Sequence, residues 1–125
     1  LDRIDIQIEV PALTSHELMD AEAGEPSAVV RERVLTARAR QQARAALNAL
    51  LPTSALNRCC VLDSAGTRLL HDAVDRGGMS ARAVHRALRV ARTIADLAGE
   101  ERVRAERLAE ALQYRAYEMR RFVVR

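Results

Sequence analysis

The sequence predicts an all-α fold, a bundle of four or five helices preceded by one isolated β-strand. Beyond residue 26, apolar residues recur three and four positions apart, which is the period of a helix with one buried face. Aromatic residues make up only 2% of the 125 residues, so Leu, Val, Ile and Ala must build the core, a composition that favours packed helices. The length suits one domain. We divide it into residues 1–26, a strand and linker, and residues 27–125, a helical domain.

The N-terminal stretch has the alternating pattern of a half-buried strand. Its apolar positions are Ile4, Ile6, Ile8 and Val10, and the polar positions between them are Asp5, Gln7 and Glu9. A lone strand cannot pair its own backbone or bury its own face. Because the chain also begins in mid-pattern and without Met, we expect it to be a fragment whose sheet lies outside it.

The strand should end at Pro11, because proline cannot donate to a ladder. The following residues, up to Pro26, are acidic and include Gly24. This composition predicts a linker with at most one short turn.

Two helices and a short one are predicted in the first half of the helical domain. Ser27 should cap a helix that runs to about residue 46, with a modest inner stripe. A short helix is expected after Thr53. Asp63 should cap a third helix over residues 64–76, which Gly77 and Gly78 should stop. The inner stripe of the first helix comprises Val30, Val34, Ala37, Gln41 and Ala45, and Leu69, Leu70, Ala73 and Val74 should face inward from the third.

The clearest helix pattern follows Ser80 and ends at Gly99. One face is apolar and the opposite face is basic. A last helix is expected over residues 104–120. The apolar face comprises Val84, Leu88, Ala91, Ala95 and Ala98, the basic face comprises Arg82, Arg86 and Arg89, and Leu108, Leu112 and Met119 should face inward from the last helix.

Composition excludes several classes of function. All 20 basic residues are arginine, so a phosphate loop of the G-x-x-x-x-G-K-[ST] type, which needs its lysine, is absent. No window is long and apolar enough for a membrane span, and no basic stretch precedes an apolar one, so we expect no signal peptide in these residues. Cys59 and Cys60 are adjacent, which suits neither a disulfide nor a metal site, so we expect small buried residues in a reducing cytoplasm. His71 and His85 have no ligand partners at useful spacing, so no metal site is predicted.

Charge divides unevenly along the chain. Residues 1–26 hold one Arg and seven acids, whereas residues 27–125 hold 19 Arg and 10 acids. A basic helical domain suits nucleotide phosphates or nucleic acid. It is equally compatible with an ordinary solvated surface.

Two stretches, "LDRIDIQIEVP" and "SARAVHRALRVARTIADLAGEERVRAERLAEALQYR", resemble the C-terminal part of magnesium-chelatase-like AAA+ ATPases, most closely the ComM (YifB) branch. The resemblance covers most of residues 1–115. It implies that "IDIQIEV" is the last strand of an upstream α/β core that holds the phosphate loop, and that a helical lid follows. It also implies ATP and Mg²⁺ as cofactors of the full-length protein, neither bound by the fragment alone, and a homo-oligomeric ring, expected to be a hexamer.

The resemblance also gives two arginines a role. "LDR" is similar to the motif whose arginine reaches the ATP of a neighbouring subunit, which maps onto Arg3 as a trans arginine finger. "SAR" at the start of the long helix is similar to the sensor 2 motif, which maps onto Arg82 as a contact to ATP phosphate. In chelatase-type members the lid is repositioned, so the Arg82 contact is open to either the same or a neighbouring subunit. Arg86 and Arg89 inherit no role.

Several functions stay open at this point. The ComM branch implies a DNA motor, and the chelatases imply metal insertion into a porphyrin. A stand-alone basic module that binds nucleic acid through Arg33, Arg40 and Arg44 is a further alternative, although it lacks aromatic residues for base stacking. The last alternative is a lid that mediates protein interactions in a protein without ATPase activity. In every case we expect the fragment alone to be no enzyme.

Overall fold

The computed structural model describes residues 3–20 and 22–115. Within them lie six α-helices and one short 3-10 helix, and the only β pairing is an isolated parallel bridge between Leu62 and Val103. The all-α prediction is confirmed. The helices in chain order are α1 (Ser15–Asp20), α2 (Ser27–Arg44), the 3-10 helix η1 (Asn48–Leu50), α3 (Thr53–Cys59), α4 (Ser64–Asp75), α5 (Ala81–Ala98) and α6 (Ala105–Gln113).

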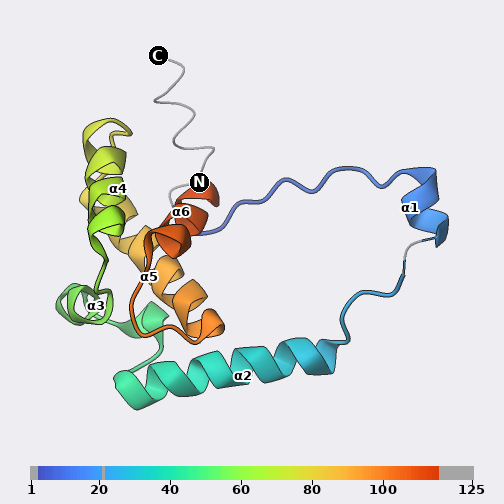
Figure 1. The fold of residues 1–125 in the computed structure, drawn as a ribbon, viewed down its shortest axis with the longest axis horizontal. Helices are drawn as coiled ribbons and strands as arrows, with labels where there is room; N and C mark the ends of the chain where they lie inside the picture. Colours follow the sequence, from blue (N-terminus) through green and yellow to red (C-terminus); the bar gives the residue numbers. More distant parts are fainter. Residues whose placement is uncertain (1–2, 21, 116–125) are drawn as a thin grey trace.

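Helix α5 is the centre of the bundle. It packs against α6, α2, α3 and η1, while α4 packs against α6 (Figure 1). The face that α5 turns to the apolar core is rich in alanine, with Ala87, Ala91 and Ala95 fully buried. Small side chains let the neighbouring helices approach closely, which explains how a core with so few aromatic residues closes.

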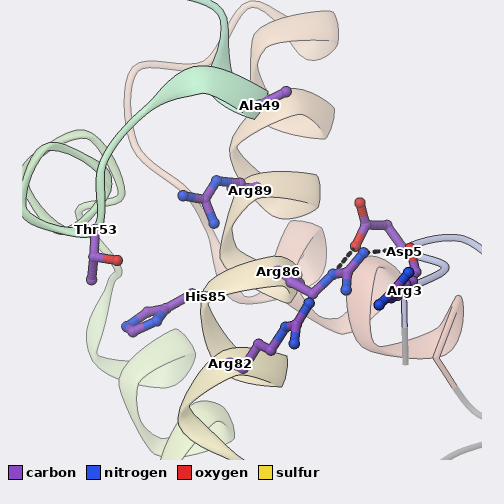
Figure 2. Close-up of a pocket in the computed structure, with 8 residues that line it drawn as sticks. All are labelled: Arg3, Asp5, Ala49, Thr53, Arg82, His85, Arg86 and Arg89. Carbon is purple, nitrogen blue, oxygen red and sulfur yellow. Dashed lines mark hydrogen bonds and ion pairs between the residues drawn. The ribbon is translucent and has the colours of Figure 1, made fainter. Parts of the chain in front are cut away.

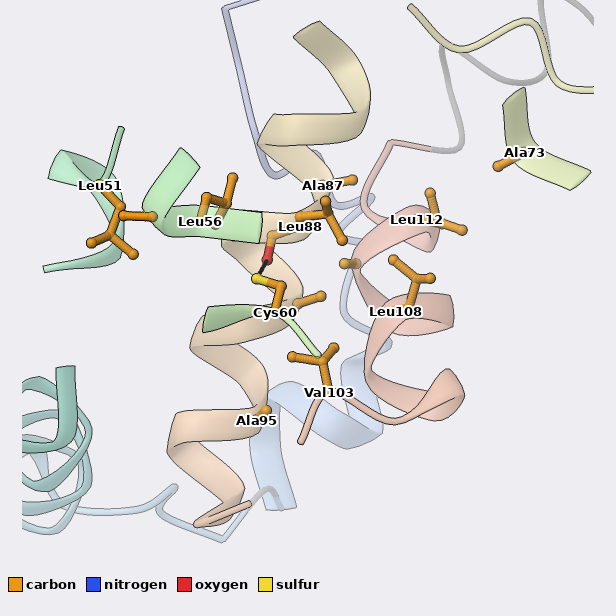
Figure 3. Packing of buried hydrophobic residues seen from close by; sticks show 13 residues of the cluster. Leu51, Leu56, Cys60, Ala73, Ala87, Leu88, Ala95, Val103, Leu108 and Leu112 are labelled. Atoms are coloured by element: carbon orange, nitrogen blue, oxygen red, sulfur yellow. Dashed lines mark hydrogen bonds between the residues drawn. The ribbon is translucent and has the colours of Figure 1, made fainter. Parts of the chain in front are cut away.

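The core is aliphatic, as the composition predicts. Leu56, Val103 and Leu108 are its largest fully buried apolar residues (Figure 3). Of the core residues predicted from the sequence, Leu88, Ala91, Leu108 and Leu112 are buried, whereas Leu69, Leu70 and Val84 are partly buried and pack against the others.

Local signals set the ends of α4 and α5. Asp63 Oδ1 accepts a hydrogen bond from the Gly66 amide at 2.7 Å, and Ser80 Oγ accepts one from the Ala83 amide at 3.2 Å. Both predicted caps are confirmed. Gly99 follows α5 with a φ of 74°, a left-handed conformation that favours glycine. Gly78, after α4, has a φ of 68°.

The strand predicted over residues 4–10 is not present among the described residues. This segment has no regular secondary structure. Ile8 and Val10 are exposed at 68% and 80%. The physical reason is that no described strand lies beside the segment, and an unpaired strand gains nothing from its alternating pattern. The expected linker does contain one short helix, α1.

Helix α2 departs from its predicted stripe. Only Ala37 and Gln41 are buried, while Val30 and Val34 are exposed at 39% and 43% and Ala45 is also exposed. The N-terminal half of α2 extends past the end of α5, so its apolar residues have nothing to cover them (Figure 1).

Two helix ends also differ from the prediction. Ser27 is the first helical residue and not the cap, because Pro26 takes the cap position and makes no side-chain hydrogen bond. Helix α6 ends at Gln113 instead of residue 120. Met119 lies outside the described residues.

Candidate functional site

The basic face of α5 turns away from the core and borders a cavity (Figure 2). Three successive turns of the helix contribute to it through positions spaced three and four apart. The spacing that predicts one basic face for Arg82, Arg86 and Arg89 therefore holds in the structure. The contributing residues are Arg82, His85, Arg86 and Arg89.

The opposite wall of this cavity comes from elsewhere in the chain. Arg3 and Asp5 close one side, and Ala49 and Thr53 line another. The cavity has a volume of about 750 Å³. The structure thus brings together the two arginines that the sequence resemblance singles out, Arg3 and Arg82, although the chain between them includes every helix from α1 to α4.

The segment that carries Arg3 is held against α5 and the end of α6. Arg86 Nε donates to Asp5 Oδ1 at 2.6 Å, and Arg86 Nη2 donates to the carbonyl oxygen of Arg3. The Gln7 amide donates to the carbonyl oxygen of Tyr114 at 2.9 Å. A buried guanidinium, that of Arg115, lies 3.9 Å from Asp5 Oδ1. These contacts fix residues 3–7 while the chain beyond them leaves the bundle (Figure 1).

Arg82 and Arg3 are the exposed cations of the site. Arg82 lies in the first turn of α5, two residues after its cap Ser80, where the helix dipole adds positive potential. Neither guanidinium makes a hydrogen bond or ion pair with another described residue, so both keep their donors for a ligand. Arg89 differs, because its Nη2 donates to the carbonyl oxygen of Leu51 at 2.5 Å.

The charge of this cavity suits an anion. Four arginines and one histidine face a single carboxylate, that of Asp5, which is already paired with Arg86. Guanidinium groups match the geometry of phosphate oxygens and bind them strongly. The donor set therefore fits a phosphoryl group presented from outside. It does not supply a magnesium site, because the cavity has only one carboxylate.

A second polar cluster, which the sequence reasoning missed, lies further along α5, toward its C-terminal end. Asp96 accepts from Arg44 at 2.6 Å and from Asn48 at 2.9 Å, and it pairs with Arg92 at 3.1 Å. Arg92 also donates to the carbonyl oxygens of Cys59, Glu100 and Glu101. Arg92 and Asp96 are almost fully buried. This cluster joins α2, η1, α5 and the loop after α5, so its role is structural.

The signal for this cluster is present in the sequence. Arg92 directly follows Ala91 and lies four residues after Leu88, within the apolar side of α5, and Asp96 follows it by another four. A charged pair at that spacing on an apolar face indicates a buried ion pair.

Two other features of the described residues bear on function. No group of three or more His, Cys, Asp or Glu side chains in residues 3–20 and 22–115 is placed to hold a metal ion. No helix in the same ranges has the length and apolar character needed to cross a membrane.

Comparisons with known proteins agree on one family. Residues 24–115 match the family described as "Magnesium chelatase, subunit ChlI C-terminal". The chain is 47% identical over 118 residues to "Competence protein ComM" of Haemophilus influenzae, which covers 93% of this chain and 23% of that protein. It is 40% identical over 122 residues to "Uncharacterized protein YifB" of Salmonella typhimurium, with the same coverage of both chains. A Mycobacterium tuberculosis relative, "Uncharacterized protein Rv2897c", is 37% identical over 126 residues, covering 97% of this chain and 25% of that protein.

The chain thus spans about a quarter of the length of the curated relatives it matches. The family match covers most of the described helices and one wall of the cavity, from α2 to the end of α6. The ComM and YifB relatives match 93% of the chain, which is more than the family match covers. The chain belongs to the magnesium chelatase subunit ChlI C-terminal family, on its ComM and YifB branch.

Proposed function

We propose that this chain is the lid of a ring-forming AAA+ ATPase and that it senses the nucleotide of a neighbouring subunit through Arg3 and Arg82. The observation that carries the proposal is the shared cavity. Two exposed guanidiniums from distant parts of the sequence line one cationic cavity, and neither makes a hydrogen bond or ion pair with another described residue.

The two arginines would act differently on the phosphates. When a γ-phosphoryl group is transferred, negative charge spreads over its oxygens, and a guanidinium supplied by Arg3 would offset that charge. Arg82 would contact phosphate from the first turn of α5. Because α5 is the centre of the bundle, a change at its N-terminal end reaches most of the lid. ATP and Mg²⁺ would be held by the core of the full-length protein, and the core supplies the phosphate loop that this chain lacks.

The shared cavity also bears on which subunit's nucleotide Arg3 and Arg82 contact. Arg3 and Arg82 of one chain line the same space, so we propose that both reach the same nucleotide, that of the neighbour. The alternative is that Arg3 serves the neighbour while Arg82 serves its own subunit.

Mixed rings of the full-length protein test this arrangement. One set of subunits carries Arg3→Ala, and the other carries Arg82→Ala. If both arginines serve the neighbour, every interface lacks one of them, and mixing restores no ATP hydrolysis. If Arg82 serves its own subunit, some interfaces become complete, and partial recovery would contradict the proposal.

The matched control uses subunits that lack the phosphate-loop lysine of the core. Mixing them with either arginine variant should restore part of the activity, because some interfaces then pair an intact loop with intact arginines. Failure of both mixtures to recover would overturn the trans assignment. Hydrolysis by the isolated 125-residue chain would overturn the lid proposal as a whole.

We propose a ComM-type DNA motor as the activity of the full-length protein. The support is the 47% identity over 93% of this chain to a protein named for competence. Stimulation of ATP hydrolysis by branched DNA is the test, and stimulation by a porphyrin instead would favour a chelatase. We also propose that the full-length protein is located in the cytoplasm and forms a hexameric ring.

The stand-alone nucleic-acid module has less support from the structure. Arg33 is paired with Glu25 at 2.5 Å, and Arg44 is paired with buried Asp96. Two of its three arginines are therefore already engaged, which leaves a weaker basic surface on α2 than the sequence suggests.

A further inference from the structure

We infer that Arg86 is a positioning residue which, with Asp5, holds the N-terminal segment (residues 3–7) against α5 and so keeps the Arg3 guanidinium beside Arg82. We name the Arg86–Asp5 pair, together with the hydrogen bond from Arg86 to the Arg3 carbonyl, the clasp. The inference rests on the proposed function, because it concerns how the two sensing arginines stay together.

The clasp is built from a geometry specific to arginine. Two nitrogens of one guanidinium bind two acceptors of the segment, the Asp5 carboxylate through Nε at 2.6 Å and the Arg3 carbonyl oxygen through Nη2 (Figure 2). A lysine ammonium lacks this planar fork. The backbone of Arg3 is thus fixed directly, in the same residue whose side chain the site needs.

Other contacts restrict the segment from the opposite side. The Gln7 amide binds the Tyr114 carbonyl oxygen, and Arg115 adds a buried positive charge near Asp5. The side chain of Asp5 is nevertheless 49% exposed. Loss of the Asp5 carboxylate should therefore release the segment without unfolding the bundle.

The clasp makes a prediction opposite to that of simple electrostatics. Removing the negative charge of Asp5 from a cationic cavity should strengthen phosphate binding if Arg86 is itself a phosphate ligand. If Arg86 positions Arg3, the same change should lower ATP hydrolysis, because the Arg3 guanidinium is no longer held beside Arg82. Misplacement of a catalytic group by about 1 Å can cost ~10²-fold in rate.

The experiment compares Asp5→Ala, Arg86→Ala and Glu25→Ala in the full-length ATPase. Glu25→Ala is the matched control, because it also removes an acid from an arginine pair, but away from the cavity. We expect kcat to fall roughly tenfold to a hundredfold for both clasp variants with KM for ATP unchanged, and no change for the control. Higher activity or a lower KM for Asp5→Ala would overturn the inference.

Amide hydrogen exchange of the 125-residue chain supplies a readout that does not involve ATP. Asp5→Ala should accelerate exchange at Gln7 and leave α5 unchanged, whereas Asp5→Glu should retain protection and activity in part. Unchanged exchange at Gln7 would overturn the clasp itself. If Arg3→Ala leaves ring hydrolysis intact while Gln7 exchange responds as expected, the proposed function fails and the clasp stands.

Discussion

At the scale of single residues, arginine has three different roles that depend on its surroundings. Arg82 is exposed and makes no hydrogen bond or ion pair with another described residue. Arg86 binds the N-terminal segment through Asp5. Arg92 is 2% exposed and belongs to a buried ion-paired cluster. The guanidinium suits all three because it stays charged and offers five donors in a plane. The type of residue predicts none of these roles, whereas burial and partners decide each one.

Arg82→Ala in the full-length protein should lower ATP hydrolysis and weaken its coupling to motor output. The reason is that Arg82 is exposed at the first turn of α5 on the cavity wall. Arg102→Ala is the matched control, since Arg102 is an exposed arginine on the loop after α5. Steady-state ATPase assays measure both, and an equal loss in the two variants would mean that general charge, not the cavity, is responsible.

Cys60 should make the fold sensitive to alkaline pH. Burial raises the pKa of its thiol from an ordinary value of 9.0 to about 11. The folded state thus retains the proton longer than the unfolded state does, so the stabilisation is complete below pH 9 and declines as pH rises toward 11. A change of about two pKa units corresponds to roughly 2–3 kcal/mol.

Urea unfolding between pH 8 and 11 measures this effect, with Cys60→Ala as the comparison. The variant should lose stability less steeply over that range than the original chain does. Parallel curves for the two proteins would show that the thiol of Cys60 does not titrate as its burial requires.

At the scale of secondary structure, α5 combines two functions on opposite faces. Its alanine-rich face closes the core, and its basic face borders the cavity. Its cap at Ser80 and its stop at Gly99 are local, so the helix begins and ends where the sequence predicts. Helix α2 is the contrast, because Ala37 is the only one of its apolar residues that is buried.

Leu88→Ala should destabilise the bundle by ~2–5 kcal/mol, because the side chain is buried and its loss leaves a cavity. Leu97→Ala is the matched control on the same helix, since Leu97 is 49% exposed. It should change stability by no more than about 0.5 kcal/mol. Chemical unfolding followed by circular dichroism measures both, and equal losses would contradict the assigned orientation of α5.

At the scale of the whole molecule, α5 links the packed core to the cationic cavity, and residues 3–7 add the second wall. The remainder of the N-terminal region, up to α2, makes few contacts with the bundle (Figure 1). The helical domain should therefore fold without it.

A chain that starts at residue 27 should keep its helical bundle and lose only ~1 kcal/mol of stability. The contacts removed are the ion pairs of Asp5 and Glu25, whose carboxylates are about half exposed, and a few hydrogen bonds. Urea unfolding measures the loss, and gel filtration shows whether the exposed Ile4, Ile6, Ile8 and Val10 cause association of the longer chain. Failure of the shorter chain to fold would contradict this account, and a dimer that persists in it would show that these residues are not responsible.

The sequence by itself determined the features that depend on neighbouring residues. The caps at Asp63 and Ser80, the stop at Gly99 and the two faces of α5 follow from side chains within a few positions, so all were predictable. The family resemblance likewise singled out Arg3 and Arg82. The ends of α2 and α6 differ from the prediction, and neither helix has a side-chain cap.

Tertiary structure alone decided the features that depend on distant partners. Residues 4–10 have a strand pattern but no described strand beside them, and Val30 is exposed. Arg92 is buried where α3 and the loop after α5 supply acceptors for its guanidinium. The clasp joins residues 81 positions apart, Asp5 and Arg86. Only the packing of the bundle brings Arg3 to the wall opposite Arg82, because no local interaction links them.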